Sequence, residues 1–407
     1  MKAPASASAE RDPTGVPEDN WLAVATYELR MPEEDLLSIE RDPFSNKNEK
    51  PAWDLTSIGR EASASKMAPV TFVAEGHEYR GVQVRVRGSW ARTWPKKALK
   101  VIFPKDDRFD GHHAVNLNSA WRDPAFLREP LAYHVFASCG LPVPQCHMAR
   151  LLLNGKFRGL YVDVEQPEKP LLKRNDLKGA ILYKALSGQA DERDMGPGPR
   201  WSRVYERASD KEAGLEDLQK FCRDLQAAPD ARAFFEERVN LDFYIDYLAG
   251  CVLVQHWDGF NKNHFVVYDA GDTHKWFIMP WDLDRTFGDW WDMSFSHYDA
   301  PILLGTQASP GITGWNRLEE RFMADPVLRA RFLKRLEELL EAEFTTDKLF
   351  PLIDQIAAAI AKDAPEDRRR WPNHAGDLRN GVQGVKRFIE QRRAFLKGEI
   401  PKLRKAG

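Results

Sequence analysis

The sequence lacks the short motifs that mark the commonest nucleotide-binding and hydrolytic enzymes. No G-x-x-x-x-G-K-[ST], G-x-G-x-x-G, H-E-x-x-H or G-x-S-x-G occurs in the 407 residues. Only four cysteines are present and none forms a C-x-x-C pair, so neither a disulfide scaffold nor a structural zinc site is expected. No apolar run approaches the roughly 18 residues that a membrane helix needs, which predicts no membrane span.

The chain also lacks a charge of one dominant sign. Lys and Arg number 59 against 61 Asp and Glu, a net charge of −2, so no overall field favours nucleic acid, and we expect no nucleic-acid partner. The segment 1–20 is small, polar and Pro-containing, and we expect a disordered tail without the apolar core of a signal peptide. The sequence leaves two locations open, the cytoplasm or, if a leader has been removed, export to the cell surface.

Hydrophobic periodicity predicts an α+β protein with a β-rich lobe at 21–166 and a mainly helical lobe at 167–407. Strands are expected at 82–87 and 99–103, and a hairpin at 151–162 turns at Asn154-Gly155. A helix is expected to begin at Asp123-Pro124, an N-cap followed by proline. Helical spacing then covers 218–225, 241–254, 326–340, 348–360 and 382–396.

The most informative stretch surrounds a hairpin expected at 264–268 and 276–279. Asp258 and Asn263 precede it, five residues apart, which is the spacing of the base and the metal-binding Asn in the protein-kinase catalytic loop. Asp282 and Asp284 follow it, where kinases place an Asp that holds magnesium. The order of parts predicts phosphoryl transfer with Asp258 as the catalytic carboxylate and with Asn263, Asp282 and Asp284 as ligands of Mg²⁺. Each pair alone is also compatible with ordinary turn chemistry.

The first lobe should supply cations for the phosphates of ATP. The turn Arg87-Gly88-Ser89 closes one strand, and Lys97 and Lys100 lie at the start of the next, an arrangement similar to a glycine-rich loop with a strand lysine. We expect Lys97 to reach the phosphates, with Arg87 and Lys100 as second choices. Solvated lysines at a sheet edge are the alternative interpretation.

The predicted join between the lobes is a further candidate for nucleotide contact. Glu165-Gln166 ends a strand there, and a chain that passes between two lobes can pair with an adenine edge. An ordinary strand end is the alternative.

Taken together, these pieces resemble the spore-coat protein H (CotH-type) kinase family, which has an atypical protein-kinase-like, two-lobed fold. The resemblance runs from about residue 80 to 290, with one later helix, and is carried by the following segments: 85–89 with 95–100, 126–128 with 131–133, 153–155 with 159–161, 164–166, 172–174, 258–263 and 280–288. It implies an ATP- and Mg²⁺-dependent transferase that phosphorylates Ser or Thr of a protein substrate. It also implies Asp258 in the catalytic position and Asp282 at the metal, assisted by Asn263 and Asp284. Kinases also pair a helix Glu with the lysine that contacts the phosphates. Glu129 lies in the corresponding helix here, but the sequence does not identify its lysine partner.

Two alternatives stay open. The same fold could transfer AMP or glutamate instead of phosphate, or it could serve as an inactive coat scaffold, which the four retained site residues argue against. An aromatic cluster after the metal loop, from Trp281 to Tyr298, is compatible with a wall of the acceptor site or with plain packing.

Overall fold

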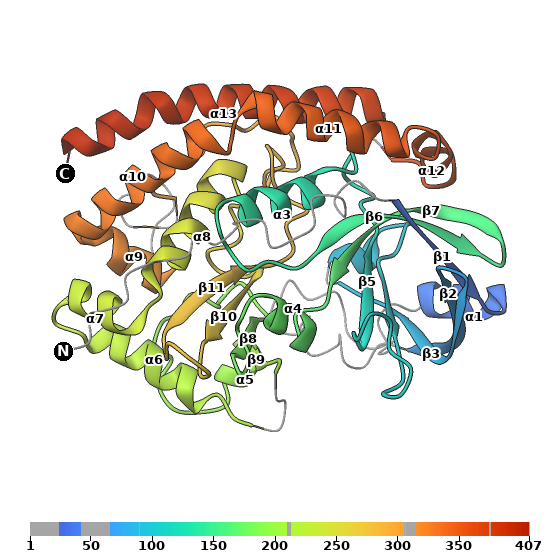
Figure 1. Ribbon diagram of the computed structural model, residues 1–407, viewed down its shortest axis with the longest axis horizontal. Coiled ribbons are helices and arrows are strands. Elements are labelled where there is room, and N and C mark those ends of the chain that lie inside the picture. The colour runs from blue at the N-terminus through green and yellow to red at the C-terminus, as the bar shows by residue number, and fades with distance from the viewer. Residues whose placement is uncertain are drawn as a thin grey trace, which may run out of the picture.

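A computed structural model describes residues 24–41, 66–88, 90–209, 213–304, 306, 315–373 and 376–406. The predicted tail at 1–20 and Ser89 lie outside these ranges. The fold is mixed α+β, with a β-rich region, a second sheet and many helices (Figure 1).

The β-rich region is a closed barrel. Its strands are β1 (Val24–Arg30), β2 (Met67–Ala74), β3 (His77–Val86), β4 (Leu99–Ile102), β5 (Ala114–Asn118), β6 (Cys146–Leu153) and β7 (Lys156–Glu165), in the order β1-β2-β3-β4-β5-β7-β6. Parallel pairing of β1 with β6 closes it, from Val24 opposite Met148 to Leu29 opposite Leu153. The helix α1 (Glu33–Arg41) packs on β2 and β3.

Alternation of side chains builds the barrel interior. On β3, Val82, Val84 and Val86 are buried, whereas the residues between them are partly exposed. They join a core that includes Phe72 and Phe103, whose rings meet edge to face at 5.3 Å. Because the inward face is fixed by this pattern, the outward side chain of the residue that follows β3, Arg87, is placed by the barrel.

A four-stranded sheet lies between the barrel and the helices in Figure 1. Its order is β11 (Trp276–Pro280), β10 (His264–Tyr268), β8 (Ile181–Ala185) and β9 (Tyr205–Arg207), all antiparallel. The predicted hairpin forms its β10–β11 half, whereas the β8–β9 half was not predicted.

The helices make up most of the remaining chain. They are α3 (Arg128–Ser138), α4 (Lys169–Arg174), α5 (Trp201–Val204), α6 (Glu216–Ala227), α7 (Ala231–Arg238), α8 (Leu241–Val254), α9 (Arg317–Ala324), α10 (Pro326–Ala342), α11 (Thr346–Ile360), α12 (Ala364–Arg370) and α13 (Leu378–Ala406), with a short 3₁₀ turn η3 (Trp90–Thr93). Side chains of Asn240, Asp325 and Thr345 cap three of them. None of the helices in the described ranges combines the length and apolar composition needed to cross a bilayer.

The helix predicted from Asp123 begins later, at Arg128. Asp123 accepts hydrogen bonds from the backbone N–H groups of Ala125 (2.9 Å) and Arg128 (2.8 Å), but Phe126 has a φ of +59°. A left-handed residue cannot continue a helix, so 124–127 forms a turn ahead of α3. The helix then packs closely on α8, because a Cβ on Gly250 would lie 2.4 Å from the Phe136 ring.

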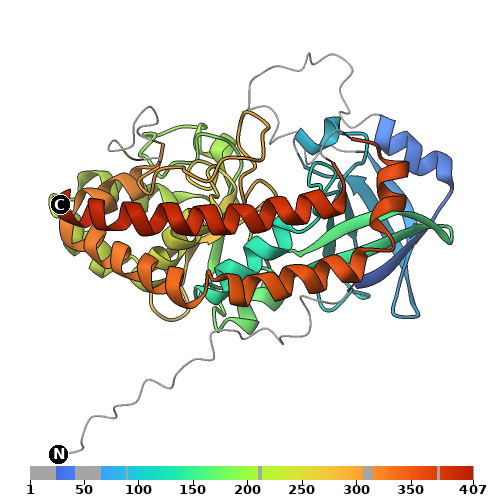
Figure 2. The same cartoon turned by 90° about the horizontal axis from the view of Figure 1, so that it is seen from above.

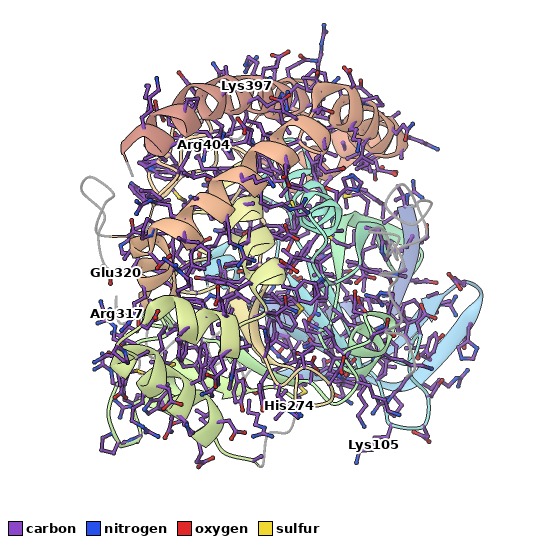
Figure 3. The ribbon with its side chains drawn as sticks, turned by 60° about the vertical axis from the view of Figure 1, so that its left-hand side comes forward. Lys105, His274, Arg317, Glu320, Lys397 and Arg404 are labelled. Carbon is purple, nitrogen blue, oxygen red and sulfur yellow. The ribbon has the colours of Figure 1, made fainter. Side chains whose placement is uncertain are left out.

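The C-terminal helices connect the two ends of the molecule. Seen from above, α11 and α13 run side by side along its length and α12 lies over the barrel (Figure 2). Lys96, before β4, is fully buried and pairs with Asp367 of α12 at 2.5 Å. At the other end, Lys397 and Arg404 of α13, labelled in Figure 3, pair with Glu341 (2.9 Å) and Glu337 (2.8 Å) of α10. The Lys96–Asp367 pair thus holds the barrel side against α12, and the other two pairs hold α13 against α10.

Candidate active site

The catalytic loop follows the end of α8. Gln255 has a φ of +56° and ends the helix, and the chain then turns through His256 to Asp258. Asp258 is 2% exposed. Its Oδ2 accepts a hydrogen bond from Asn263 Nδ2 at 2.9 Å and lies 3.4 Å from Lys262 Nζ. Its Oδ1 has no hydrogen-bond partner among the described residues, and its ionic contact with His256 Nδ1 is 3.5 Å long.

Buried polar groups form hydrogen bonds that hold this loop in place. Tyr247 Oη donates to the Gly259 carbonyl at 2.8 Å, and a Cβ on Gly259 would lie 2.4 Å from the His256 ring. His264 Nε2 lies 2.9 Å from Glu192 Oε1, and its Nδ1 lies 2.8 Å from the Gly259 carbonyl. Burial disfavours protonation of His264, but Glu192 and two carbonyls outweigh it and raise its pKa. The loop that carries Asp258 is therefore fixed by hydrogen bonds to buried groups.

The second acidic segment follows β11. Asp282 and Asn263 both have a φ of +59°, and the Trp281 N–H donates to the Asn263 carbonyl at 3.0 Å. Asp and Asn tolerate this left-handed conformation better than most residues do. Further on, the Phe287 N–H donates to the Val254 carbonyl at the end of α8, at 2.8 Å. The β10–β11 hairpin thus brings both predicted acidic segments together, as its position in the sequence suggested.

Carboxylates from three segments influence one another here. Burial, and then the charges of Asp282, Glu129 and Asp258, raise the pKa of Asp284 well above its ordinary value. Glu129, from the first turn of α3, is 4% exposed, and both its carboxylate oxygens accept from Asn118 Nδ2 at 2.8 Å. Burial and the charge of Asp282 raise its pKa as well. Four acids around one space are a concentration of negative charge that a cation would relieve.

Cations face this cluster from the barrel and from the second sheet. Arg87 Cζ lies 5.8 Å and Lys184 Nζ 5.7 Å from the centroid of the Trp281 ring, next to Asp282. Burial lowers the pKa of Lys184 to about 8, helped by Arg87 and opposed by Asp282. Burial, with the charges of Arg87 and Arg92, lowers the pKa of Arg85 to about 10. Burial is the main cause of both lowered pKa values and the charge of Arg87 adds to it, so these cations lie in an enclosed place that a bound anion would complement.

The other predicted phosphate-binding residues have other contacts. Lys97 precedes β4, and its Nζ donates to the carbonyls of Arg92 and Trp94, at 2.6 Å each. Lys100 Nζ donates to Gln166 Oε1 at 2.8 Å. Gly88 is exposed and has a φ of +90°, as a tight turn requires.

At the predicted lobe join, the side chain of Glu165 forms internal contacts. It is 9% exposed, accepts from Arg174 Nη1 at 3.0 Å and from the Gln145 N–H at 2.8 Å. Its own N–H donates to the Gln145 carbonyl at 2.8 Å. The side chains of Glu165 and Gln166 therefore fasten the end of β7.

The acidic residues fit a magnesium ion by chemistry. They offer hard oxygen ligands, and the buried Asp258 Oδ1 lacks a hydrogen-bond partner in the described chain. Within the described ranges, no group of three or more His, Cys, Asp or Glu side chains is placed so that it could hold a metal ion. Magnesium is commonly held by one or two carboxylates, with phosphate oxygens and water completing its shell, so a nucleotide would have to supply the remaining ligands.

Sequence reasoning missed Lys184 and left Glu129 without a partner. Lys184 lies on β8, where no motif surrounds it, and only the pairing of β8 with β10 brings it to the site. The pKa of Glu129 is raised, and the cation whose charge partly opposes that rise is Arg87.

Comparisons with known proteins identify the family of the chain. A family model described as CotH kinase protein matches residues 84–396. Inner spore coat protein H of Bacillus subtilis is 27% identical over 293 residues, which cover 70% of this chain and 78% of that protein. Invasin CotH2 of Rhizopus delemar is 21% identical over 244 residues, 54% of this chain and 40% of the relative.

Two solved structures of low similarity were also found. The Helicobacter pylori proinflammatory kinase CtkA has a TM-score of 0.35 at 11% identity and covers 75% of this chain and 94% of its own. The HipA, HipB and operator DNA complex of Shewanella oneidensis has a TM-score of 0.33 at 13% identity. The alignment covers 96% of this chain and 76% of the chain in that complex. Because both TM-scores are below 0.5, the family of the chain is assigned from the match to the family model.

Proposed function

The chain belongs to the CotH kinase protein family, and we propose that it transfers the γ-phosphate of ATP, with Mg²⁺, to Ser or Thr of a protein. One observation carries the proposal. Around Trp281, the cations Arg87 and Lys184 face an acidic group that includes Asp282. A polyphosphate would neutralise the cations, and the divalent cation bound to it would neutralise the acidic group.

The proposed roles of the acidic residues follow from their contacts. Asp258 orients the acceptor hydroxyl and takes its proton, while Asn263 and Lys262 hold its other oxygen. The acceptor oxygen forms a bond to the γ-phosphorus, the bond from that phosphorus to the β-phosphate oxygen breaks, and ADP leaves. Asp282, Asp284 and Asn263 would hold Mg²⁺, which when bound neutralises charge on the phosphates.

The proposal revises the order of the phosphate-binding candidates. Arg87 has no carboxylate in hydrogen-bond contact among the described residues and is aimed at the Trp281 ring, whereas Lys97 Nζ already serves two carbonyls. We therefore assign the main phosphate contact to Arg87, with Lys184 beside it. The turn at Gly88-Ser89 and the Lys100–Gln166 pair remain candidates for the outer part of the nucleotide.

Two further predictions belong to the same proposal. The nucleotide would lie between a barrel lobe at 21–166 and a helical lobe at 167–407. The spore-coat name of the Bacillus subtilis relative supports a coat or cell-surface location. Contacts such as Lys96 with Asp367 cross the proposed boundary, so large opening of the lobes is not expected.

Intact-mass spectrometry tests the transferred group. The purified chain is incubated with ATP and Mg²⁺, with and without glutamate, and with casein as a generic acceptor. We expect the mass of one or more phosphates on the protein or on casein, and no increase in the Asp282→Ala variant. An increase of one AMP or one glutamate would refute phosphoryl transfer but keep the site. No covalent change, together with no thermal shift on adding Mg-ATP, would support the scaffold alternative.

A further inference from the structure

Three tryptophans pack together beside the catalytic loop, and of these Trp257 and Trp290 are buried whereas Trp291 is exposed. Trp257 immediately precedes Asp258, and Trp290 and Trp291 follow the metal loop. The ring centroids of Trp290 and Trp291 lie 4.2 Å apart, and those of Trp257 lie 5.8 and 5.7 Å from them. We call these three residues the tryptophan shelf.

The outer edge of the tryptophan shelf is open to solvent. Trp291 is 43% exposed and Met293 is 51% exposed. They are two of only four large hydrophobic residues that are exposed in the described chain, and the other two, Met67 and Val327, lie on other elements. A concentration of exposed apolar surface next to a catalytic residue marks an interaction site more often than a lone exposed side chain does.

The shelf is held in place before any ligand binds. Trp257 Nε1 donates to the Asp289 carbonyl at 2.9 Å, and the Met293 N–H donates to the Trp290 carbonyl at 3.0 Å. Arg285 lies over the Trp257 ring at 5.2 Å and also donates to the Trp290 carbonyl. Because the rings are already fixed, little side-chain entropy would be lost when a partner docks on them.

Lys262 connects the shelf to the reacting groups. Its Nζ lies 5.9 Å from the Trp257 ring centroid and 3.4 Å from Asp258 Oδ2. A molecule whose hydroxyl reaches Asp258 would therefore have its neighbouring groups near Trp257 and the two rings packed on it.

We propose that the tryptophan shelf binds the acceptor polypeptide, and that the acceptor carries an aromatic or long aliphatic side chain close to the modified Ser or Thr. This inference rests on the proposed function, since it names the substrate class of the same site. The occupant is an extended protein segment because the shelf is continuous with Asp258, where the acceptor hydroxyl must lie. Exposed Trp residues packed on other rings are typical anchors at protein interfaces.

A peptide array tests the substrate class. Each peptide holds one Ser or Thr, and each flanking position carries in turn Trp, Phe, Leu, Ala, Glu or Lys. With Mg-ATP, the wild-type chain should prefer Trp, Phe or Leu at one or two flanking positions over Ala, by about tenfold or more in kcat/KM.

Matched variants link that preference to the shelf. In Trp291→Ala, the KM for the best peptide should rise about tenfold or more and the preference for an apolar flank should disappear, while the KM for Mg-ATP moves less than twofold. Trp291→Phe should restore most of the preference. Met67→Ala, which removes an equally exposed side chain from β2, should behave as wild type.

The outcomes separate this inference from the proposed function. A wild-type chain that phosphorylates peptides without any apolar preference, or a Trp291→Ala variant that keeps the preference, would overturn the inference alone. A wild-type chain that transfers phosphate to no peptide and to no protein would overturn the proposed function and the inference with it. A dimer in sedimentation velocity that dissociates in Trp291→Ala would show that a second copy of the chain covers the shelf, and would also overturn the inference.

Discussion

The buried pair between Lys96 and Asp367 should be a principal support of the whole fold. Both side chains are fully buried, and their contact at 2.5 Å joins the barrel to α12. Lys96 Nζ also donates to the Leu160 carbonyl and lies 4.7 Å from the Tyr161 ring centroid. Burial lowers the pKa of Lys96 to about 8 although Asp367 raises it, so the ammonium form still predominates at pH 7.

The Asp367→Asn variant should leave this ammonium group buried without its counter-charge. Removing one partner of a buried ion pair costs about 3–5 kcal/mol. With a urea m value of about 3 kcal/mol/M for a chain of this size, the unfolding midpoint should fall by about 1 M or more. The midpoint is measured by circular dichroism in the far ultraviolet at pH 7, with the wild type and the variant at equal concentration.

Two further variants, one compensating and one control, test the same explanation. Lys96→Met combined with Asp367→Leu removes both charges and should recover part of the lost stability, although it leaves the Leu160 N–H and carbonyl without these partners. Lys402→Met breaks an exposed pair with Glu399 and should leave the midpoint where it is. A double variant as unstable as Asp367→Asn, or an Asp367→Asn midpoint equal to the wild type, would refute the reasoning.

Three shorter predictions follow from other parts of the structure. Burial opposes ionisation of Glu168, but hydrogen bonds from His112 and His113 lower its pKa to about 2. Because the pKa of Glu168 is lower in the folded than in the unfolded state, this stabilisation is present above about pH 4.5 and is lost as the pH falls toward 2. In urea titrations, the wild type should lose about 2 kcal/mol over that pH range that Glu168→Gln does not lose. Arg87→Gln should weaken Mg-ATP binding about tenfold or more in calorimetry, whereas Lys97→Gln should change it less than threefold, and the reverse order would restore Lys97 as the phosphate ligand. Gly259→Ala should lower kcat by about a hundredfold with little change in ATP affinity, because its Cβ would displace the loop that carries Asp258, and an unchanged kcat would contradict the close approach at His256.

Local signals in the sequence were sufficient for the elements that depend on neighbouring residues. The helix predicted at 241–254 has those bounds in the structure, and the hairpin turn at Asn154-Gly155 has φ values of +49° and +77°. Spacing alone also placed Asp258 and Asn263 on one loop, where they are hydrogen bonded. In these cases, periodicity or turn chemistry carries the whole information.

Features that depend on distant pairing were not accessible from the sequence. Closure of the barrel requires β1 to pair with β6, more than a hundred residues later in the chain, and no local pattern encodes that. Lys184 reaches the site only because β8 pairs with β10. The position of Lys97 in the sequence suggested a phosphate ligand, but its Nζ donates to the carbonyls of Arg92 and Trp94, and such contacts are visible only in three dimensions.

The central claim is that Asp282 serves nucleotide binding and Asp258 serves phosphate transfer, and separate measurements of binding and turnover test it most directly. Mg-dependent ATP binding is measured by calorimetry, and phosphate transfer to casein by intact mass, for the wild type, Asp258→Asn and Asp282→Ala. The account predicts that Asp282→Ala loses binding, whereas Asp258→Asn keeps binding within threefold and loses transfer by a factor of about a hundred or more. An Asp258→Asn variant with full transfer activity would contradict the assignment of the catalytic residue and, with it, the proposed mechanism.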